Sequence, residues 1–186
     1  QWGREEETAQ RLIDEFSPDL LVIGIRNDNF LTSTWDDHGM AYELDCNRPV
    51  LTVRQNNAFV TLRKMVILSD TFDRLSDSAI DIISSLQERG GIEFDILQTH
   101  KNAGFLSAVK AQLAVVNTEI RYRIQSYQLP SLRSDLSDVH TLYPSDIIMV
   151  DTTRRSAHFW SRLIHPKGPK HQTTFCGPVP VITLRS

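Results

Sequence analysis

The chain has 186 residues, of which 40% are hydrophobic and 23% charged, so it carries enough apolar side chains for a real core. Its formal net charge of -3 argues against nucleic acid as a partner, and no apolar run approaches the roughly 18 residues of a membrane span. Two scattered cysteines, Cys46 and Cys176, suit a reducing cytoplasm. The first residues include no initiator methionine and do not resemble a signal peptide, so we expect a soluble, cytoplasmic fragment of a longer protein.

Taken in chain order, the first 54 residues predict helix, strand, helix, strand. Ala9, Leu12, Ile13 and Phe16 recur at helical spacing within residues 4–16. Residues 20–23 are continuously apolar, as in a strand that is covered on both faces. A capped helix over residues 35–45 and a strand over residues 49–54 follow.

After a short polar stretch, strands and helices continue to alternate. Strands are predicted at residues 65–68, 92–98, 119–127, 147–150 and 179–184, and helices at 75–86, 105–113, 132–139 and 156–164. The strand at 119–127 alternates apolar and polar residues, which favours a position near an edge of the sheet. This order predicts an α/β fold with a mostly parallel sheet and helices on both faces.

Two strand sequences each occur twice in the chain with similar residues. "PVLTVR" at residues 49–54 aligns without gaps on "PVITLR" at residues 180–185, and "SPDLLVIG" at 17–24 matches "YPSDIIMVD" at 143–151. In each copy the second strand follows the first after a predicted helix. We therefore predict a tandem repeat, with residues 1–57 as the second half of a first unit and residues 58–186 as a complete second unit.

The order of the predicted strands and helices, together with the repeated strand motifs, resembles the universal stress protein family. That family has an "Asp-Leu-Ile-Val-Met-Gly" type fourth strand and a "Cys-Pro-Val-Leu-Val-Val" type fifth strand, to which "SPDLLVIG" with "CNRPVLTVR" and "SDIIMVD" with "CGPVPVITLR" are similar. The resemblance implies a universal stress protein-like, Rossmann-like fold. Domains of this fold often pair through their fifth strands, which here hold the candidate dimer residues Val50, Leu51, Val53, Val181, Ile182 and Leu184.

The resemblance also raises the question of nucleotide binding. ATP-binding members of the family carry a glycine-rich loop after the fourth strand, whose backbone approaches the phosphates. Here Gly24 is followed by no glycine before Gly39, and Asp151 is followed by none in "TTRRS". Asp70 stands where the family has an aspartate at the end of its first strand, although it could instead cap the following turn and helix. The candidate ligand residues are Asp70, Thr71, Arg154 and Arg155.

A basic segment lies near the end of the chain. Residues 154–171 contain no acidic residue and include Arg162, Lys167 and Lys170. Such a segment could bind a phosphate-bearing ligand or anionic lipid headgroups at the cytoplasmic membrane face. The alternative is a solvated helix face followed by a loop rich in proline and glycine.

No catalytic or metal-binding constellation stands out. His158, His165 and His171 with Cys176 lack the spacing of metal ligands on one helical face. The crowded residues Ser137, Asp138 and His140 are the polar surface of a short helix rather than a catalytic triad, because no G-x-S-x-G motif accompanies them. We expect no enzyme activity, no cofactor and no metal.

These patterns favour a non-catalytic regulatory and dimerisation domain. Universal stress protein-like units form cytoplasmic tails of secondary transporters, including cation–chloride cotransporters and amino-acid-permease relatives, and this sequence resembles such a tail. The expected partners are a second copy of the chain and the membrane transport domain of the same polypeptide. The alternative is a nucleotide-sensing stress protein that binds ATP, AMP or a cyclic dinucleotide.

Overall fold

The structure is a computed structural model, and it describes residues 5–25, 48–54, 61–71, 73–88, 90–99, 102–116, 119–126, 136–152 and 179–185. Its helices are α1 (Glu5–Phe16), α3 (Asp77–Gln87), α4 (Ala103–Val116) and α5 (Leu136–Leu142). Its strands are β1 (Leu21–Ile25), β2 (Val50–Arg54), β3 (Lys64–Ser69), β4 (Glu93–Gln98), β5 (Arg121–Ser126), β6 (Ile147–Thr152) and β7 (Val181–Arg185).

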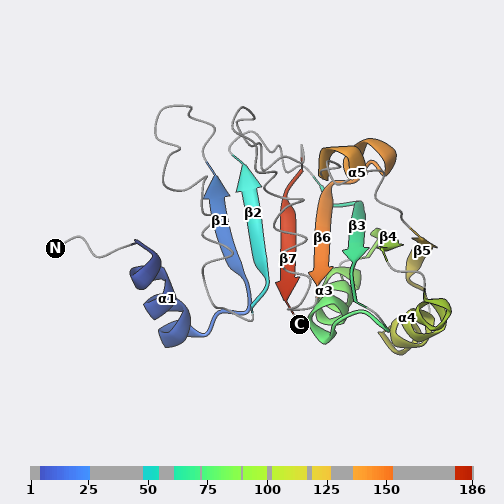
Figure 1. The fold of residues 1–186 in the computed structure, drawn as a ribbon, viewed down its shortest axis with the longest axis horizontal. Coiled ribbons are helices and arrows are strands. Elements are labelled where there is room, and N and C mark those ends of the chain that lie inside the picture. Colours follow the sequence, from blue (N-terminus) through green and yellow to red (C-terminus); the bar gives the residue numbers. More distant parts are fainter. Residues whose placement is uncertain are drawn as a thin grey trace.

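The strands form one seven-stranded sheet in the order β1-β2-β7-β6-β3-β4-β5 (Figure 1). All neighbouring strands run parallel except β2 and β7, which pair antiparallel. The prediction of a mostly parallel α/β sheet is confirmed. The alternating strand, β5, lies at an edge as predicted, because its outward-facing polar residues remain in contact with water.

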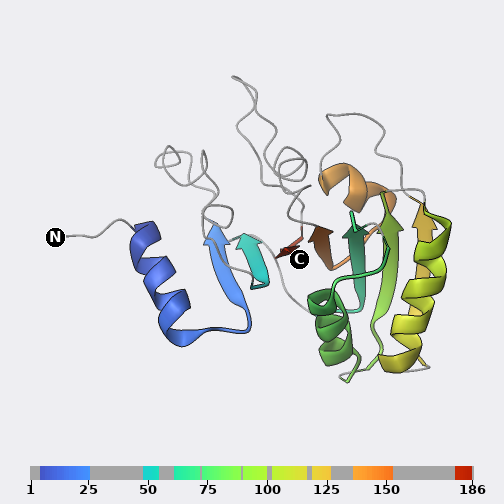
Figure 2. The same cartoon turned by 60° about the horizontal axis from the view of Figure 1, so that its bottom comes forward.

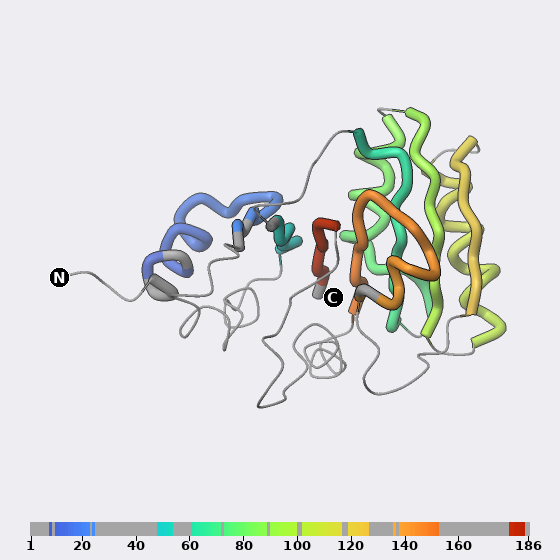
Figure 3. The backbone as a smooth tube through the Cα atoms, turned by 90° about the horizontal axis from the view of Figure 1, so that it is seen from above, coloured from blue at the N-terminus to red at the C-terminus, as the bar shows by residue number. Residues whose placement is uncertain are grey.

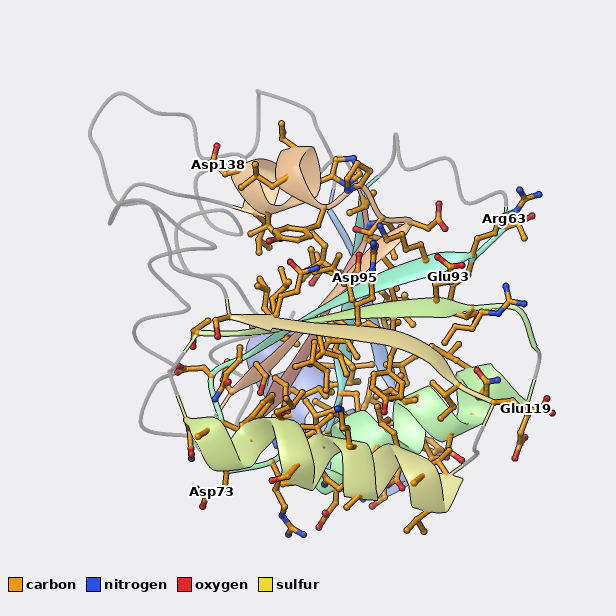
Figure 4. The ribbon with its side chains drawn as sticks, turned by 90° about the vertical axis from the view of Figure 1, so that its right-hand side faces the viewer. Arg63, Asp73, Glu93, Asp95, Glu119 and Asp138 are labelled. Carbon is orange, nitrogen blue, oxygen red and sulfur yellow. The ribbon has the colours of Figure 1, made fainter. Side chains whose placement is uncertain are left out.

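Helices cover both faces of the sheet (Figures 2 and 4). Successive residues of a strand point to opposite faces, so Met65 and Ile67 of β3 pack with the buried side chains of α3 and α4. Val66 and Leu68 point the other way and pack with Val139 of α5. Both faces of β3 are therefore buried, which explains its unbroken apolar sequence.

The ends of α3 follow from local chemistry. Ser76 is the N-cap, and its Oγ accepts a hydrogen bond from the backbone N–H of Ala79 at 3.2 Å. Shortly after the helix, Gly90 and Gly91 both adopt positive φ, a backbone region that glycine enters without steric cost. The N-cap of this helix is Ser76 and not Asp70, whose capping of the preceding turn stays a prediction. The short helix expected at 132–139 is described from Leu136, and the helices predicted at 35–45 and 156–164 lie outside the described residues.

The two repeated motifs have the same register. The backbone N–H of Leu21 donates to the carbonyl of Pro49 at 2.9 Å, and that of Ile148 donates to the carbonyl of Pro180 at 3.1 Å. Leu21 of β1 accordingly lies opposite Val50, as Ile148 of β6 lies opposite Val181. The sequence alignment of the two motifs thus coincides with their hydrogen bonding.

The antiparallel junction between β2 and β7 is locally symmetric. Leu51 lies opposite Ile182, its counterpart in the sequence alignment. Val50 lies opposite Thr183, and Thr52 lies opposite Val181, which are the two crossed pairs of the same alignment. Crossed pairing of equivalent residues is the pattern of a two-fold interface, here formed within one chain.

Candidate functional site at the carboxyl ends of the parallel strands

Three polar side chains end neighbouring strands at one level of the sheet. Ser69 of β3 lies opposite Gln98 of β4 on one side and Asp151 of β6 on the other. All three are buried. In open α/β sheets the carboxyl ends of the parallel strands are the usual place for a ligand, so this row is the candidate site.

Asp70 and Thr71 continue this row and are bonded to their neighbours. The Asp70 carboxylate accepts a hydrogen bond from Thr99 Oγ1 at 2.9 Å, and its backbone N–H donates to the carbonyl of Asp151 at 2.9 Å. Thr71 and Ser69 share a hydroxyl–hydroxyl hydrogen bond of 2.6 Å. Both predicted residues therefore lie in the site, where these bonds tie the ends of β3, β4 and β6 together.

Asp151 places a carboxylate against the start of α3. Its Oδ2 accepts the backbone N–H of Ser76 at 3.0 Å, whereas Oδ1 has no hydrogen-bond partner in the described part of the chain. The residue is fully buried. Burial raises the pKa of Asp151, and the hydrogen bonds with Ser76 offset part of that rise.

This arrangement disfavours a phosphate at the start of α3. A helix N-terminus binds phosphate through free backbone N–H groups, but Ser76 donates its N–H to Asp151 and Ala79 donates its N–H to Ser76. A second anion there would also be repelled by an ionised Asp151. The motif alignment places Asp151 where the first copy has Gly24, beside whose Cα a side chain would meet open space.

The remaining predicted ligand residues and the basic segment fall outside the part of the chain that the structure describes. Arg154 and Arg155, and the basic-segment residues Arg162, Lys167 and Lys170, lie outside the described residues, as do the histidines at 158, 165 and 171. In the described ranges, no three His, Cys, Asp or Glu side chains gather as metal ligands would.

The predicted dimer strands lie side by side within the chain. Val50 and Leu51 face Thr183 and Ile182 across the junction, while Val53 pairs with β1 and Leu184 with β6. Both edges of each strand are thus occupied. A dimer through these strands would require exchange of strands between copies, and it stays a prediction.

Sequence reasoning did not anticipate a further buried carboxylate, Asp95 of β4. Its Oδ1 and Oδ2 accept hydrogen bonds from Arg123 Nε at 2.7 Å and Nη2 at 2.9 Å, and Lys64 Nζ lies 2.9 Å from Oδ2. Asp95 is only 2% exposed, on the α5 side of the sheet (Figure 4). The available signal was an aspartate inside the apolar run "EFDIL", with basic residues in the neighbouring strands.

The environment of Asp95 determines its charge. Burial by itself would raise the pKa of Asp95, but the hydrogen bonds and charges of Arg123 and Lys64 outweigh burial and hold the pKa below its usual range. Asp95 therefore links three neighbouring strands as an ionised carboxylate.

Asp138 and His140 of α5 lie in different environments. Burial lowers the pKa of His140, and the charge of Asp146 opposes part of that shift. His140 Nδ1 has no hydrogen-bond partner among the residues that the structure describes, so Asp138 does not orient the ring as a triad acid would. Asp138 is an exposed residue of the helix surface.

Comparisons with known proteins bear on the fold. No protein-family model and no curated protein matches the chain. A solved structure of a universal stress protein from Archaeoglobus fulgidus is similar, with a TM-score of 0.62 and 94% of this chain covered. The chain has a universal stress protein-like fold. Its sequence is 14% identical to that protein, a level at which the likeness shows fold alone, and the match spans 64% of the archaeal chain.

Proposed function

We propose that this chain is a non-catalytic regulatory and assembly domain. The observation that carries the proposal is the polar row at the strand ends, whose members bond to one another. Asp70 is occupied by Thr99, and Asp151 places a carboxylate at the N-terminus of α3. A site organised in this way stabilises the sheet, and in the described part of the chain the backbone N–H groups of Ser76 and Ala79 are not open to a phosphate.

The assembly role is supported by the continuous sheet. We take residues 1–57 and 58–186 to be two copies of one unit, the first of them partial. The shared register of the two motifs and the symmetric β2–β7 junction support this division. Because strands of both copies belong to one sheet, displacement of one copy would be transmitted to the other through hydrogen bonds.

The finer proposal places the domain on the cytoplasmic side of a membrane transport protein of the cation–chloride cotransporter or amino-acid-permease type. Its support is the resemblance of the two strand motifs and the loss of the glycine-rich loops. None of the described helices combines the length and apolar character needed to span a bilayer. In this role the domain would bias the conformation of the transport domain by about 1–3 kcal/mol, the usual scale of coupling between sites.

Calorimetry tests the non-catalytic proposal against nucleotide sensing. We expect no binding of ATP, AMP or cyclic dinucleotides, because the N–H groups of Ser76 and Ala79 are already bonded and Asp151 places a carboxylate beside them. Micromolar binding that is lost in Asp70→Ala and retained in Asp81→Ala, a change at an exposed position of α3, would replace our proposal with nucleotide sensing.

The complete open reading frame and a transport assay test the finer proposal. We expect membrane-spanning segments in the same polypeptide, and deletion of this domain should change the transport rate without preventing membrane insertion. An open reading frame without such segments would contradict the transporter assignment. Binding of the basic segment to anionic lipid stays a prediction that vesicles with and without phosphatidylserine would test.

A further inference from the structure

The outer edge of β1 is a sheet edge with an apolar surface. No described strand pairs with it, since β1 ends the strand order. Leu21 donates its N–H to β2, so the alternating backbone turns the N–H and C=O groups of Val22 and Gly24 away from β2. Figures 1 and 3 show α1 on the far side of β1 from β2.

The second unit shows what covers the equivalent edge. Alignment of Asp19 with Asp146 makes Val22 the counterpart of Met149, which pairs with Ile67 of β3. Met149 is 0% exposed beneath α3, whereas Val22 is 64% exposed. Met149 and Val22 thus occupy equivalent positions in the repeat. A strand and a helix cover Met149, whereas no described strand or helix covers Val22 in this way.

The helices of the two motifs show the same difference. Leu12 of α1 is the counterpart of Val139 of α5, which packs on Val66 and Leu68 of β3. Val139 is 0% exposed and Leu12 is 41% exposed, and Phe16 at the end of α1 is 69% exposed. The apolar face of α1 thus lacks the strands that α5 covers.

A polar residue completes the comparison. The Asp146 carboxylate accepts the backbone N–H groups of Arg63 and Lys64 at 2.8 and 2.9 Å, and so fixes the beginning of β3 beside β6. Its counterpart Asp19 is exposed at the beginning of β1. Asp19 could accept hydrogen bonds from the first backbone N–H groups of an added strand, as Asp146 does for β3.

We propose that the edge of β1 and the apolar face of α1 dock a strand–helix–strand segment from outside these 186 residues, with the pattern of residues 64–98. Its first strand would run parallel to β1, with the residue equivalent to Ile67 opposite Val22. The segment's helix would cover Val22, and its two strands would cover Leu12 and Phe16. This inference rests on the repeat and the assembly role proposed above.

Strand addition can be measured with the whole chain and a synthetic peptide that has the sequence of residues 61–71. We expect the peptide to slow hydrogen exchange of the Val22 and Gly24 amides by about tenfold or more, because paired edge amides are protected, while β5 at the other edge is unchanged. A peptide carrying Ile67→Lys should have no effect.

Three variants of the chain make the test specific. Val22→Lys places a charge on the edge strand directly opposite Ile67 of the peptide, so the protection should disappear. Asp19→Asn should weaken peptide binding by about tenfold through loss of the charged acceptor. Val115→Lys, at an exposed apolar position of α4, should leave binding unchanged.

Absence of protection, or equal protection in Val22→Lys, would overturn the inference. So would sedimentation showing that the chain alone dimerises with protection of β1, because the occupant would then be a second copy. Nucleotide binding at Asp70 would count against the proposed function and leave this edge unaffected, so the two proposals can fail separately.

Discussion

At the scale of single residues, two buried aspartates illustrate how surroundings determine charge. Asp95 has two cations within hydrogen-bonding distance, and its pKa is lowered. Asp151 accepts the Ser76 N–H through one oxygen, its other oxygen has no hydrogen-bond partner among the described residues, and its pKa is raised by burial. The first is a stabilising carboxylate at neutral pH, whereas the second reduces stability when it ionises.

Asp151→Asn should therefore stabilise the chain at neutral pH. Because the folded-state pKa of Asp151 is raised, the folded state holds its proton more tightly than the unfolded state, and stability falls as pH rises from about 4 through the folded-state pKa. We expect the variant to gain about 1 kcal/mol in free energy of unfolding at pH 7–8, and less at pH 4. Urea denaturation between pH 4 and 8 measures this difference, and a difference that does not change with pH would contradict it.

Lys64→Met should expose the dependence of Asp95 on its partners. A depressed folded-state pKa stabilises the fold above the unfolded value, and that stabilisation is lost as pH falls through the folded-state pKa. Removing Lys64 should raise the pKa of Asp95 and cost about 1–3 kcal/mol at pH 7. NMR titration of the carboxyl carbon gives the pKa, with Lys110→Met on the exposed face of α4 as control.

At the scale of elements, the N-terminus of α3 joins the helix to the sheet. Ser76 caps the helix through its side chain and gives its backbone N–H to Asp151 of β6, a residue distant in sequence. The start of the helix is thus determined by both a local cap and a tertiary contact.

Substitutions of Ser76 should separate these two contributions. Asparagine and aspartate are both good N-caps, so Ser76→Asn should change stability by only a few tenths of a kcal/mol. Ser76→Asp would place a second carboxylate near Asp151 and should cost about 1 kcal/mol or more at pH 7. Thermal or urea denaturation measures both, and Asp151→Asn should restore the aspartate variant. Equal stability of the Asn and Asp variants would show that Asp151 does not act on this cap.

At the scale of the whole molecule, the β2–β7 junction joins the two parts of the sheet. It is the antiparallel pair in an otherwise parallel sheet, and three residue pairs define its register. At its centre Ile182 is buried in the larger core cluster, and Leu51 packs against the same cluster.

A double-mutant cycle of Leu51→Ala and Ile182→Ala measures this junction. Ile182→Ala should cost about 2–4 kcal/mol because it removes a buried side chain. The two residues face each other across the strands, so their effects should be coupled by about 0.5–1 kcal/mol. Strictly additive free energies of unfolding would argue that the strands do not pair in solution.

The sequence determined the order of strands and helices in the described ranges, the mostly parallel sheet and the edge position of β5. These follow from periodicity and from residues that are close in the chain. A continuous apolar run requires burial of both faces of its strand, whereas an alternating run requires burial of one face only. It also identified the repeated strands, whose registers agree in the structure.

Only the tertiary structure decided that β2 and β7 pair with each other, that Asp151 accepts a hydrogen bond from Ser76, and that Asp95 forms ion pairs with Lys64 and Arg123. It also placed Asp146 as the acceptor that holds the start of β3, although the sequence marked that aspartate only as part of a motif. Such contacts join residues far apart in the chain. They depend on strand order and on which face each side chain occupies, and these are set by packing of the whole sheet rather than by local preference.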